Sequence, residues 1–301
     1  MNEAAQPLSL EMRATVFAAA IMAVAIGAST PIATKFAVLQ IDPLLVGLLR
    51  TVLGAMVALP LVLMLRIPLP RKRRHIVLLV LSGSCAFIGF PVIFGIGQSL
   101  TSTVHSGLIY AAIPILVGVF ASMIERRVPA RSWWMGGAIA FAGEAFLIVS
   151  RGGAEVSGAT LVGDALVLAS MIVLSLGYVI GARLTQEGYG TWGTTFWGLV
   201  AGGIMLAPFV PMAATGTGWE EAGAAAWGGV AFLAMGSSIL AYVCLYWSFG
   251  KGGIAKTGML YFLAPVITGV LAVLMLGETL TAPLLMAAGI ILGGVYIAQR
   301  Q

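Results

Sequence analysis

Ten apolar stretches, each close to the length that crosses a bilayer as a helix, dominate the sequence. A helix needs about 20 apolar residues to span the hydrocarbon core of a membrane. Lipid accepts only helices or closed barrels, and these stretches lack the two-residue alternation of barrel strands. The sequence therefore predicts an all-α membrane protein with ten transmembrane helices, at residues 14–35, 43–65, 76–97, 102–124, 132–150, 160–182, 192–212, 227–249, 255–276 and 282–299.

The charge content excludes a soluble protein. Only 9% of the residues are charged, whereas an average soluble domain carries roughly 25%. The formal net charge of +5 comes from basic residues between the apolar stretches rather than along one soluble face, so nucleic acid is not an expected partner. In an apolar chain, such residues face the anionic headgroups of the lipid bilayer.

The distribution of Lys and Arg indicates how the helices are oriented. With the N-terminus in the cytoplasm, most of these residues fall in inner segments, including residues 71–74 and the pair Arg126 and Arg127. The positive-inside rule then places both termini in the cytoplasm. We therefore expect a multi-pass protein of the bacterial inner membrane.

One short motif occurs twice. Tyr110 precedes Pro114 by four positions, and Tyr261 precedes Pro265 in the same way, with an offset of 151 between the two copies. Both copies fall within apolar stretches at equivalent places in the two halves of the chain. The repetition predicts that the bundle is built from two related units.

The two units are expected to cover residues 14–150 and 158–299 and to share one bundle around a central cavity. Each holds five helices, and because five is odd, the second copy enters the membrane from the opposite side. Inverted repeats are typical of transporters, whose substrate site lies near the bilayer midplane between the repeats. The alternative is a duplicated membrane protein that transports nothing.

A further set of residues, spread over nearly the whole chain, carries a family resemblance. It comprises Gly27-Ala28-Ser29 with Lys35, then Arg50, the stretch from Gln98 through Ser106 to Pro114, and Tyr246, Lys256, Tyr261, Pro265 and Leu276-Gly277-Glu278. On these residues the chain resembles the drug/metabolite transporter superfamily, in the branch whose repeat is called the EamA domain. It departs from that pattern at Ile26, where Trp is usual, and at Ile124-Glu125, where Leu-Gly-Glu is usual.

The resemblance implies an exporter of small metabolites that works by alternating access, as two halves rock around a central cavity. The branch includes exporters of amino acids, some of them selective for aromatic ones. A multidrug or nucleotide-sugar carrier of the same superfamily is the alternative within transport. A membrane protein with no transport role is the alternative outside it.

Aromatic and hydroxyl side chains gather on the helices that line the cavity in that family. Ser238, Tyr242 and Tyr246 are spaced by four residues and so share one helix face, although Tyr246 also suits an anchor at the membrane interface. Aromatic surroundings with few charges favour an aromatic or apolar zwitterion over a phosphorylated sugar. The predicted cavity residues are Ser29, Thr30, Phe87, Phe90, Tyr110, Tyr178, Ser238, Tyr242, Tyr246 and Tyr261.

Ionisable groups inside the membrane are costly, so each is a functional hypothesis. Arg50 and Glu144 lie at similar depths below the outer surface, which predicts a buried ion pair. That pair acts either as a latch between two helices or as a gate or proton site. His105, near the outer start of its helix, is either a proton site that titrates in the physiological range or a solvated donor at a helix end.

Proline and glycine mark breaks and close contacts. Pro31, Pro114 and Pro265 each remove a backbone hydrogen bond and free a carbonyl one turn earlier, so each predicts a helix break, and the freed carbonyls are also candidate substrate ligands. The small-residue spacings Gly198/Gly202 and Gly289/Gly293 predict close helix packing.

Enzymatic chemistry finds no support in the sequence. There is no His-Glu-x-x-His, Gly-x-Ser-x-Gly or phosphate-loop motif. Cys85 and Cys244 stand alone in apolar stretches without the spacing of a metal site. We therefore expect no enzyme activity, no cofactor, no metal, and a monomer that handles a small-molecule substrate.

Overall fold

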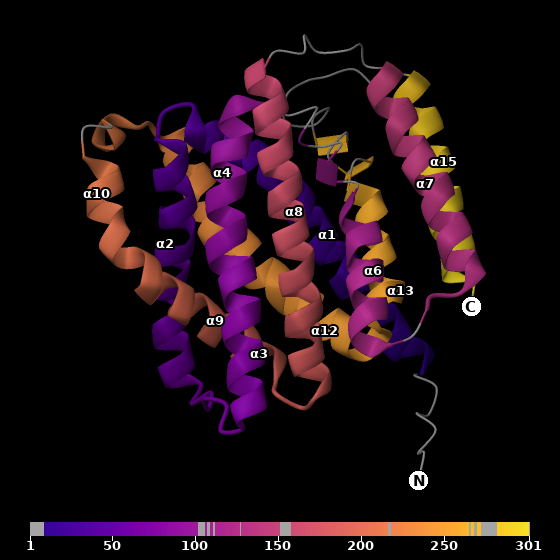
Figure 1. Ribbon diagram of the computed structural model, residues 1–301, viewed down its shortest axis with the longest axis horizontal. Coiled ribbons are helices and arrows are strands. Elements are labelled where there is room, and N and C mark those ends of the chain that lie inside the picture. The colour runs from indigo at the N-terminus through magenta and orange to yellow at the C-terminus, as the bar shows by residue number, and fades with distance from the viewer. Residues whose placement is uncertain are drawn as a thin grey trace.

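The computed structural model describes residues 9–101, 106, 109–110, 112–126, 128–150, 158–215, 218–264, 266–267, 270–271 and 282–300. The helices of this part of the chain pack side by side in one bundle (Figure 1). Its regular secondary structure consists of helices only. The prediction of an all-α protein is thus confirmed for the described residues.

The first half of the chain supplies α1 (Leu10–Val38), α2 (Pro43–Met64), α3 (Arg73–Gly83), the π-helix η1 (Ser84–Gly89), α4 (Phe90–Leu100), α6 (Ala112–Glu125) and α7 (Arg131–Ser150). The second half supplies α8 (Gly158–Gln186), α9 (Thr191–Leu206), η2 (Ala207–Phe209), α10 (Val210–Ala214), η3 (Trp219–Glu221), α11 (Ala224–Ala231), the π-helix η4 (Phe232–Leu240), α12 (Ala241–Gly252), α13 (Ile254–Gly258), η5 (Met259–Leu263) and α15 (Ala282–Gln299).

Six helical runs of the described chain are long and apolar enough to cross a membrane: 10–38, 43–64, 73–100, 161–186, 191–214 and 224–252. Shorter apolar helices cover 112–125, 254–263 and 285–298. Parts of the expected spans 102–124 and 255–276 lie outside the described residues. The count of ten transmembrane helices therefore stays a prediction.

The start of α2 shows how the sequence fixes a helix boundary. Asp42 is the N-cap, and its Oδ1 accepts hydrogen bonds from the backbone N–H groups of Leu44 and Leu45. Pro43 follows at the first helical position, where its missing N–H has no intrahelical partner to lose. The second expected span begins at residue 43, and α2 begins there as well.

Two long helices contain a π-helical segment, η1 between α3 and α4 and η4 between α11 and α12. A π turn displaces the regular backbone hydrogen bonds of the helix, and other donors reach its carbonyls. Thr51 Oγ1 donates to the carbonyl oxygen of Phe87 at 2.7 Å, and the Tyr242 hydroxyl donates to that of Ala86 at 3.1 Å. Side chains from other helices thus stabilise the irregular turns of η1.

Glycine allows two helices at the side of the bundle to approach closely. α7 and α15 lie side by side there (Figure 1). A Cβ atom on Gly294 would lie 2.5 Å from the backbone nitrogen of Ala140 and 2.6 Å from the carbonyl oxygen of Gly136. Only glycine at position 294 permits this contact between the two backbones.

The two predicted glycine spacings had different outcomes. Gly198 and Gly202 face the side chain of Phe87, with Cβ-to-carbon distances of 3.1 and 3.2 Å, so the first spacing does mediate helix packing. The second spacing does not mediate packing in the described part of the chain, where a Cβ on Gly289 or Gly293 would meet no atom within 4 Å. The face of α15 that packs contains Gly294 instead.

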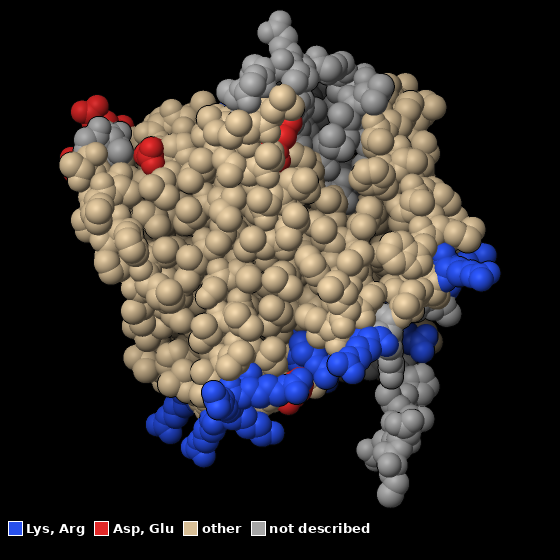
Figure 2. Space-filling model, viewed as in Figure 1, with Lys and Arg blue, Asp and Glu red and all other residues tan. Residues whose placement is uncertain are grey.

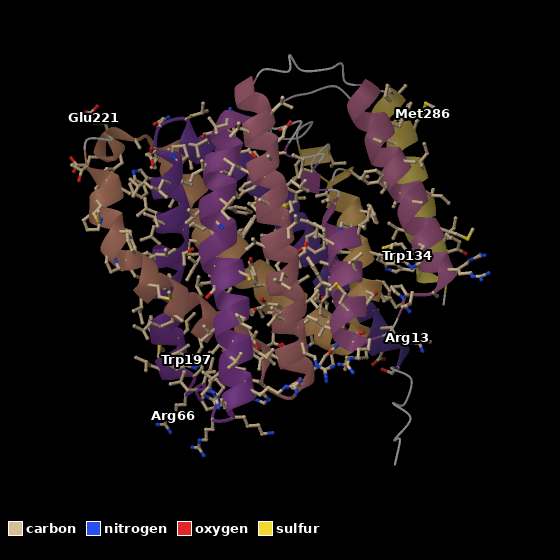
Figure 3. All side chains as sticks on the ribbon, in the orientation of Figure 1. Arg13, Arg66, Trp134, Trp197, Glu221 and Met286 are labelled. Atoms are coloured by element: carbon tan, nitrogen blue, oxygen red, sulfur yellow. The ribbon has the colours of Figure 1, made fainter. Side chains whose placement is uncertain are left out.

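The charges of the molecule divide between its two ends. On the face shown in Figure 2, Lys and Arg gather at one end and Asp and Glu lie mainly toward the other, with an uncharged surface between them. Arg13 and Arg66 lie at the basic end, and Glu221 and Met286 lie at the opposite end (Figure 3). Large apolar side chains such as Leu63 are exposed on the flanks, as expected where a protein contacts lipid.

Candidate substrate-binding site

Arg50 of α2 is the centre of the candidate site. Its side chain is buried, with 3% of the residue exposed. Its Nε donates to the hydroxyl of Ser238 at 3.0 Å, and its Nη2 donates to the hydroxyl of Ser237 at 3.1 Å. The guanidinium also lies over the ring of Phe90, 5.0 Å from the centroid, which adds a cation–π attraction.

The structure gives Arg50 different partners from the one that the sequence suggested. Glu144 lies on α7, on the opposite side of the bundle from α2 in Figure 1. The side chain of Glu144 is outside the described set. The predicted pair of Arg50 and Glu144 therefore stays a prediction, and the described partners of Arg50 are two serines of η4.

The π-helical segment η4 positions both serines. The Ser238 hydroxyl donates to the carbonyl oxygen of Leu233, five residues earlier, at 2.9 Å, which leaves its lone pairs free to accept from Arg50. The Ser237 hydroxyl shares a hydrogen bond of 2.7 Å with the Thr30 hydroxyl of α1. One network of polar side chains therefore joins α1, α2 and η4.

A cluster of aromatic rings packs beside this network. The contacts between ring centroids are Phe87–Tyr242 at 4.7 Å, Tyr178–Tyr242 at 5.3 Å, Phe90–Phe94 at 5.4 Å, Phe94–Tyr110 at 5.7 Å, Tyr242–Tyr246 at 5.8 Å and Tyr178–Tyr261 at 5.9 Å. All of these rings are buried. We call them, together with Arg50, Thr30, Ser237 and Ser238, the central cluster.

Most of the predicted cavity residues belong to the central cluster: Thr30, Phe87, Phe90, Tyr110, Tyr178, Ser238, Tyr242, Tyr246 and Tyr261. Ser29 is the exception, because its hydroxyl donates to the carbonyl oxygen of Ala25 within α1. Pro31 lies inside α1, which continues through it to Val38, and the local break predicted there stays a prediction. Pro114 lies buried in α6. His105 and Pro265 are outside the described residues.

Tyr246 is not an anchor at the membrane interface. It is completely buried, and its hydroxyl lies 3.1 Å from the Ser82 hydroxyl and 3.4 Å from the carbonyl oxygen of Gly177. The stripe of Ser238, Tyr242 and Tyr246 thus faces the interior of the bundle. This disposition favours the cavity-wall interpretation of the stripe.

Three further residues belong to this region and are absent from the predicted set. Ser237 contacts Arg50, and Phe94 bridges Phe90 and Tyr110. Gln98 is completely buried, and neither its Oε1 nor its Nε2 has a hydrogen-bond partner in the described chain. Phe90, Phe94 and Gln98 follow one another at four-residue steps, so helical periodicity identifies them.

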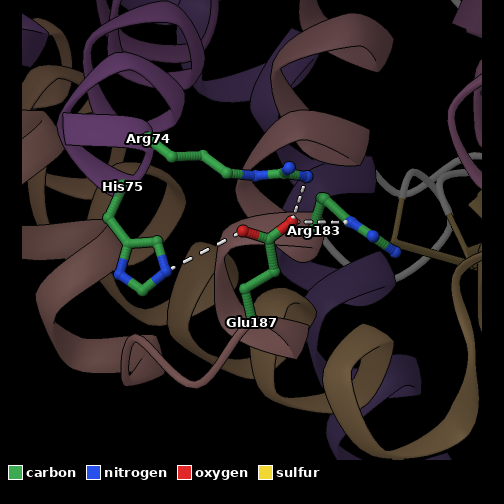
Figure 4. A network of polar contacts seen from close by, with 4 residues as sticks. All are labelled: Arg74, His75, Arg183 and Glu187. Carbon is green, nitrogen blue, oxygen red and sulfur yellow. Dashed lines mark hydrogen bonds and ion pairs between the residues drawn. The ribbon is translucent and has the colours of Figure 1, made fainter. Parts of the chain in front are cut away.

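A second polar group is formed by Arg74, His75, Arg183 and Glu187 (Figure 4). Glu187, just after α8, accepts hydrogen bonds from Arg74 at 2.6 Å and from Arg183 at 2.9 Å. His75 Nε2 lies 3.8 Å from its other carboxylate oxygen. Partial burial opposes ionisation, but the hydrogen bonds from the two arginines outweigh it and lower the pKa of Glu187.

The neighbouring loop is anchored by aromatic donors. The Tyr189 hydroxyl donates to the carbonyl oxygen of Pro68 at 2.8 Å, and Trp197 Nε1 donates to that of Ile67 at 3.1 Å. Burial raises the pKa of Tyr189 to about 12, so its hydroxyl stays protonated as a donor. The loop after α2 is therefore fixed both to the segment between α8 and α9 and to α9 itself.

Comparison with known proteins identifies the family. A family model for EamA-like transporters matches residues 14–149 and 161–299. The chain belongs to the EamA-like transporter family. It is therefore a multi-pass membrane transporter of the drug/metabolite transporter superfamily, and not an enzyme.

Individual relatives of this EamA-like transporter carry transporter names without a substrate. The chain is 30% identical over 249 residues to "Uncharacterized transporter YdeK" of Bacillus subtilis, covering 82% of this chain and 83% of the relative. It is 26% identical over 208 residues to YyaM of the same organism, 66% of each chain. An uncharacterized transporter of Archaeoglobus fulgidus is 25% identical over 212 residues, 70% of this chain and 73% of that one.

A solved structure supports the fold. One crystal structure superposes with a TM-score of 0.76 and covers 95% of this chain and 96% of its own. The sequence identity is 19%, so the similarity concerns the architecture alone. The whole bundle, rather than one half of it, is the shared architecture.

Proposed function

We propose that this EamA-like transporter exports amino acids, including aromatic ones, or related small metabolites by alternating access. The observation that carries the proposal is the central cluster itself. Polar and aromatic side chains from both halves of the chain converge on Arg50 inside a transporter bundle. Buried ionisable residues in membrane helices mark substrate pathways.

The proposed mechanism uses two inverted five-helix repeats. The π-helices η1 and η4 lie in the third expected helix of each repeat, and the family model matches each half of the chain separately. Both observations support related halves that approach the central cluster from opposite sides of the membrane. Alternating access then follows if the halves rock around the cluster.

The proposed orientation places the basic end in the cytoplasm of a bacterial cell, with the protein in the inner membrane. The segregation of Lys and Arg in Figure 2 supports it, because cytoplasmic loops carry an excess of these residues. Arg66 belongs to that end (Figure 3). In this orientation, export moves substrate from the basic end toward the end that holds Glu221.

The composition of the central cluster supports an amino acid over a nucleotide sugar. Arg50 is the only buried Lys or Arg of the described chain, whereas a diphosphate group favours several cations. Aromatic rings supply a surface for an aromatic or aliphatic side chain. One cation and several neutral hydroxyl groups match a small zwitterion.

The test is uptake into proteoliposomes that contain the purified protein. The panel holds radiolabelled phenylalanine, tryptophan, leucine, serine and glutamate, a nucleotide sugar, and a lipophilic cationic drug. We expect uptake of at least one apolar or aromatic amino acid above protein-free liposomes. If only the nucleotide sugar or only the drug is taken up, the proposed amino-acid substrate is wrong and that compound class takes its place. If correctly folded protein takes up no member of the panel, the proposal is refuted.

A further inference from the structure

Arg50 carries a buried positive charge without a buried negative partner in the described part of the chain. Its hydrogen-bond partners, Ser237 and Ser238, are neutral, and no ion pair to a described carboxylate involves it. Burial of a charge without an opposite charge is costly. A protein retains such a group where something else supplies the opposite charge.

The hydrogen bonds of the guanidinium leave one edge open. A guanidinium has five N–H donors in a fixed fork. The bonds to Ser238 and Ser237 use Nε and Nη2. The edge formed by Nη1 and Nη2 therefore retains donors from both nitrogens, and two parallel donors match the two oxygens of a carboxylate.

The surroundings of the guanidinium favour a ligand with a single negative charge. Phe90 covers the guanidinium, and the hydroxyls of Tyr110, Tyr178 and Tyr242 are close enough to interact with it electrostatically. These groups are neutral, so the cluster offers one positive charge. The single positive charge of Arg50 would neutralise only half of the charge of a phosphate dianion. It neutralises the whole charge of a carboxylate.

We propose that Arg50 binds the carboxylate group of the transported substrate through its Nη1–Nη2 edge. Ser237 and Ser238 hold the guanidinium in the required orientation, and the aromatic rings receive the rest of the molecule. This inference rests on the proposed transport function and makes it more specific. It assigns the protein to substrates that carry one free carboxylate, and it excludes the matching amides and amines.

The experiment measures ligand-induced thermal stabilisation of the purified protein in detergent, which does not depend on transport. The ligands are phenylalanine, 3-phenylpropionate, leucine and glutamate, with phenylalaninamide and phenethylamine as analogues that lack the carboxylate. A ligand that binds only the folded state raises Tm. We expect that at least one of the four carboxylate compounds raises Tm. We expect that phenylalaninamide and phenethylamine, which lack the carboxylate, do not raise it.

Variants connect this stabilisation to Arg50. Arg50→Gln is expected to weaken carboxylate binding at least about tenfold, the usual range for a charge-assisted hydrogen bond. Arg50→Lys keeps the charge but loses the paired donors, so we expect its carboxylate affinity to lie between those of the wild type and Arg50→Gln. It also tests the inference if Arg50→Gln fails to fold. Arg71→Gln changes an exposed arginine at the basic end and is expected to bind as the wild type does.

Two results would overturn the inference. One is the absence of stabilisation by any of the four carboxylates. The other is equal carboxylate binding by the wild type and both Arg50 variants. The transport proposal can fail separately from this inference. In that case the protein binds carboxylates in a manner that depends on Arg50, but no panel member is taken up into proteoliposomes.

Discussion

At the scale of single residues, Gln98 shows a polar group that the interior leaves without a partner. Its amide is buried with neither hydrogen-bonding atom satisfied in the described chain. An unsatisfied buried polar group costs about 1–3 kcal/mol. Gln98→Leu keeps a similar volume, so we expect it to raise the free energy of unfolding by about 1 kcal/mol.

Thermal unfolding in detergent checks this expectation. Thr195→Val is an independent comparison, because the Thr195 hydroxyl is also buried without a described partner. Both variants are expected to raise Tm. If Gln98→Leu lowers Tm while Thr195→Val raises it, the expectation for Gln98 is wrong. The amide of Gln98 would then stabilise the folded protein.

Glu187 predicts a specific pH dependence of stability. Its pKa is lowered in the folded protein, so the stabilisation is complete above the unfolded Glu pKa of about 4.3 and is lost as the pH falls through the folded pKa. Glu187→Gln is expected to remove this dependence and to lower stability at neutral pH by at most about 1 kcal/mol, because the pairs are near the surface.

The measurement is Tm between pH 3 and pH 7 for the wild type and Glu187→Gln, with Glu220→Gln as the control. Glu220 is exposed and adjoins Glu221, which lies at the end opposite the basic residues (Figure 3). The control is expected to follow the wild type. Identical pH profiles for Glu187→Gln and the wild type would show that the polar group of Figure 4 contributes nothing to stability.

At the scale of helices, the pair formed by α7 and α15 depends on glycine. Gly294→Ala is expected to destabilise the protein by about 1–3 kcal/mol, the usual cost of overpacking, because its Cβ would meet the backbone of Ala140 and Gly136. Gly293→Ala is the matched control, since nothing lies within 4 Å of its Cβ position. Equal Tm values for the two variants would contradict the observed packing.

The sequence predicted these helices better than their packing faces. The boundary at Asp42 was predictable because an N-cap followed by proline is a local signal. The choice of Gly294 over Gly293 was not predictable, because it depends on the rotation of α15 against its neighbour. The π-helix η1 was also missed, since its turns are stabilised by Thr51 and Tyr242 from other parts of the chain.

The candidate site was predictable in part, as the helices were: the face of one helix was predicted, but its neighbours were not. Helical spacing identified the stripe of Ser238, Tyr242 and Tyr246, which faces the interior. The hydrogen bonds from Arg50 to Ser237 and Ser238 were not predicted, because equal depth in the membrane does not specify which helices are neighbours. The groups that surround Arg50 depend on tertiary packing.

At the scale of the whole molecule, the central cluster joins the two halves of the chain. Thr30, Arg50 and Phe87 come from the first half, and Ser237, Tyr178 and Tyr242 come from the second. The rings are buried against one another. In the proposed mechanism, a substrate enters as the halves separate on one side of the membrane, which is the motion that alternating access requires.

Countertransport in proteoliposomes tests this account most directly. Labelled amino acid is added outside vesicles that contain either buffer or the same unlabelled amino acid, for each member of the panel in turn. We predict that internal amino acid accelerates uptake several-fold in the wild type and that Arg50→Gln abolishes the acceleration. Uptake that is unaffected by internal substrate, or that proceeds equally well in Arg50→Gln, would contradict alternating access through the central cluster.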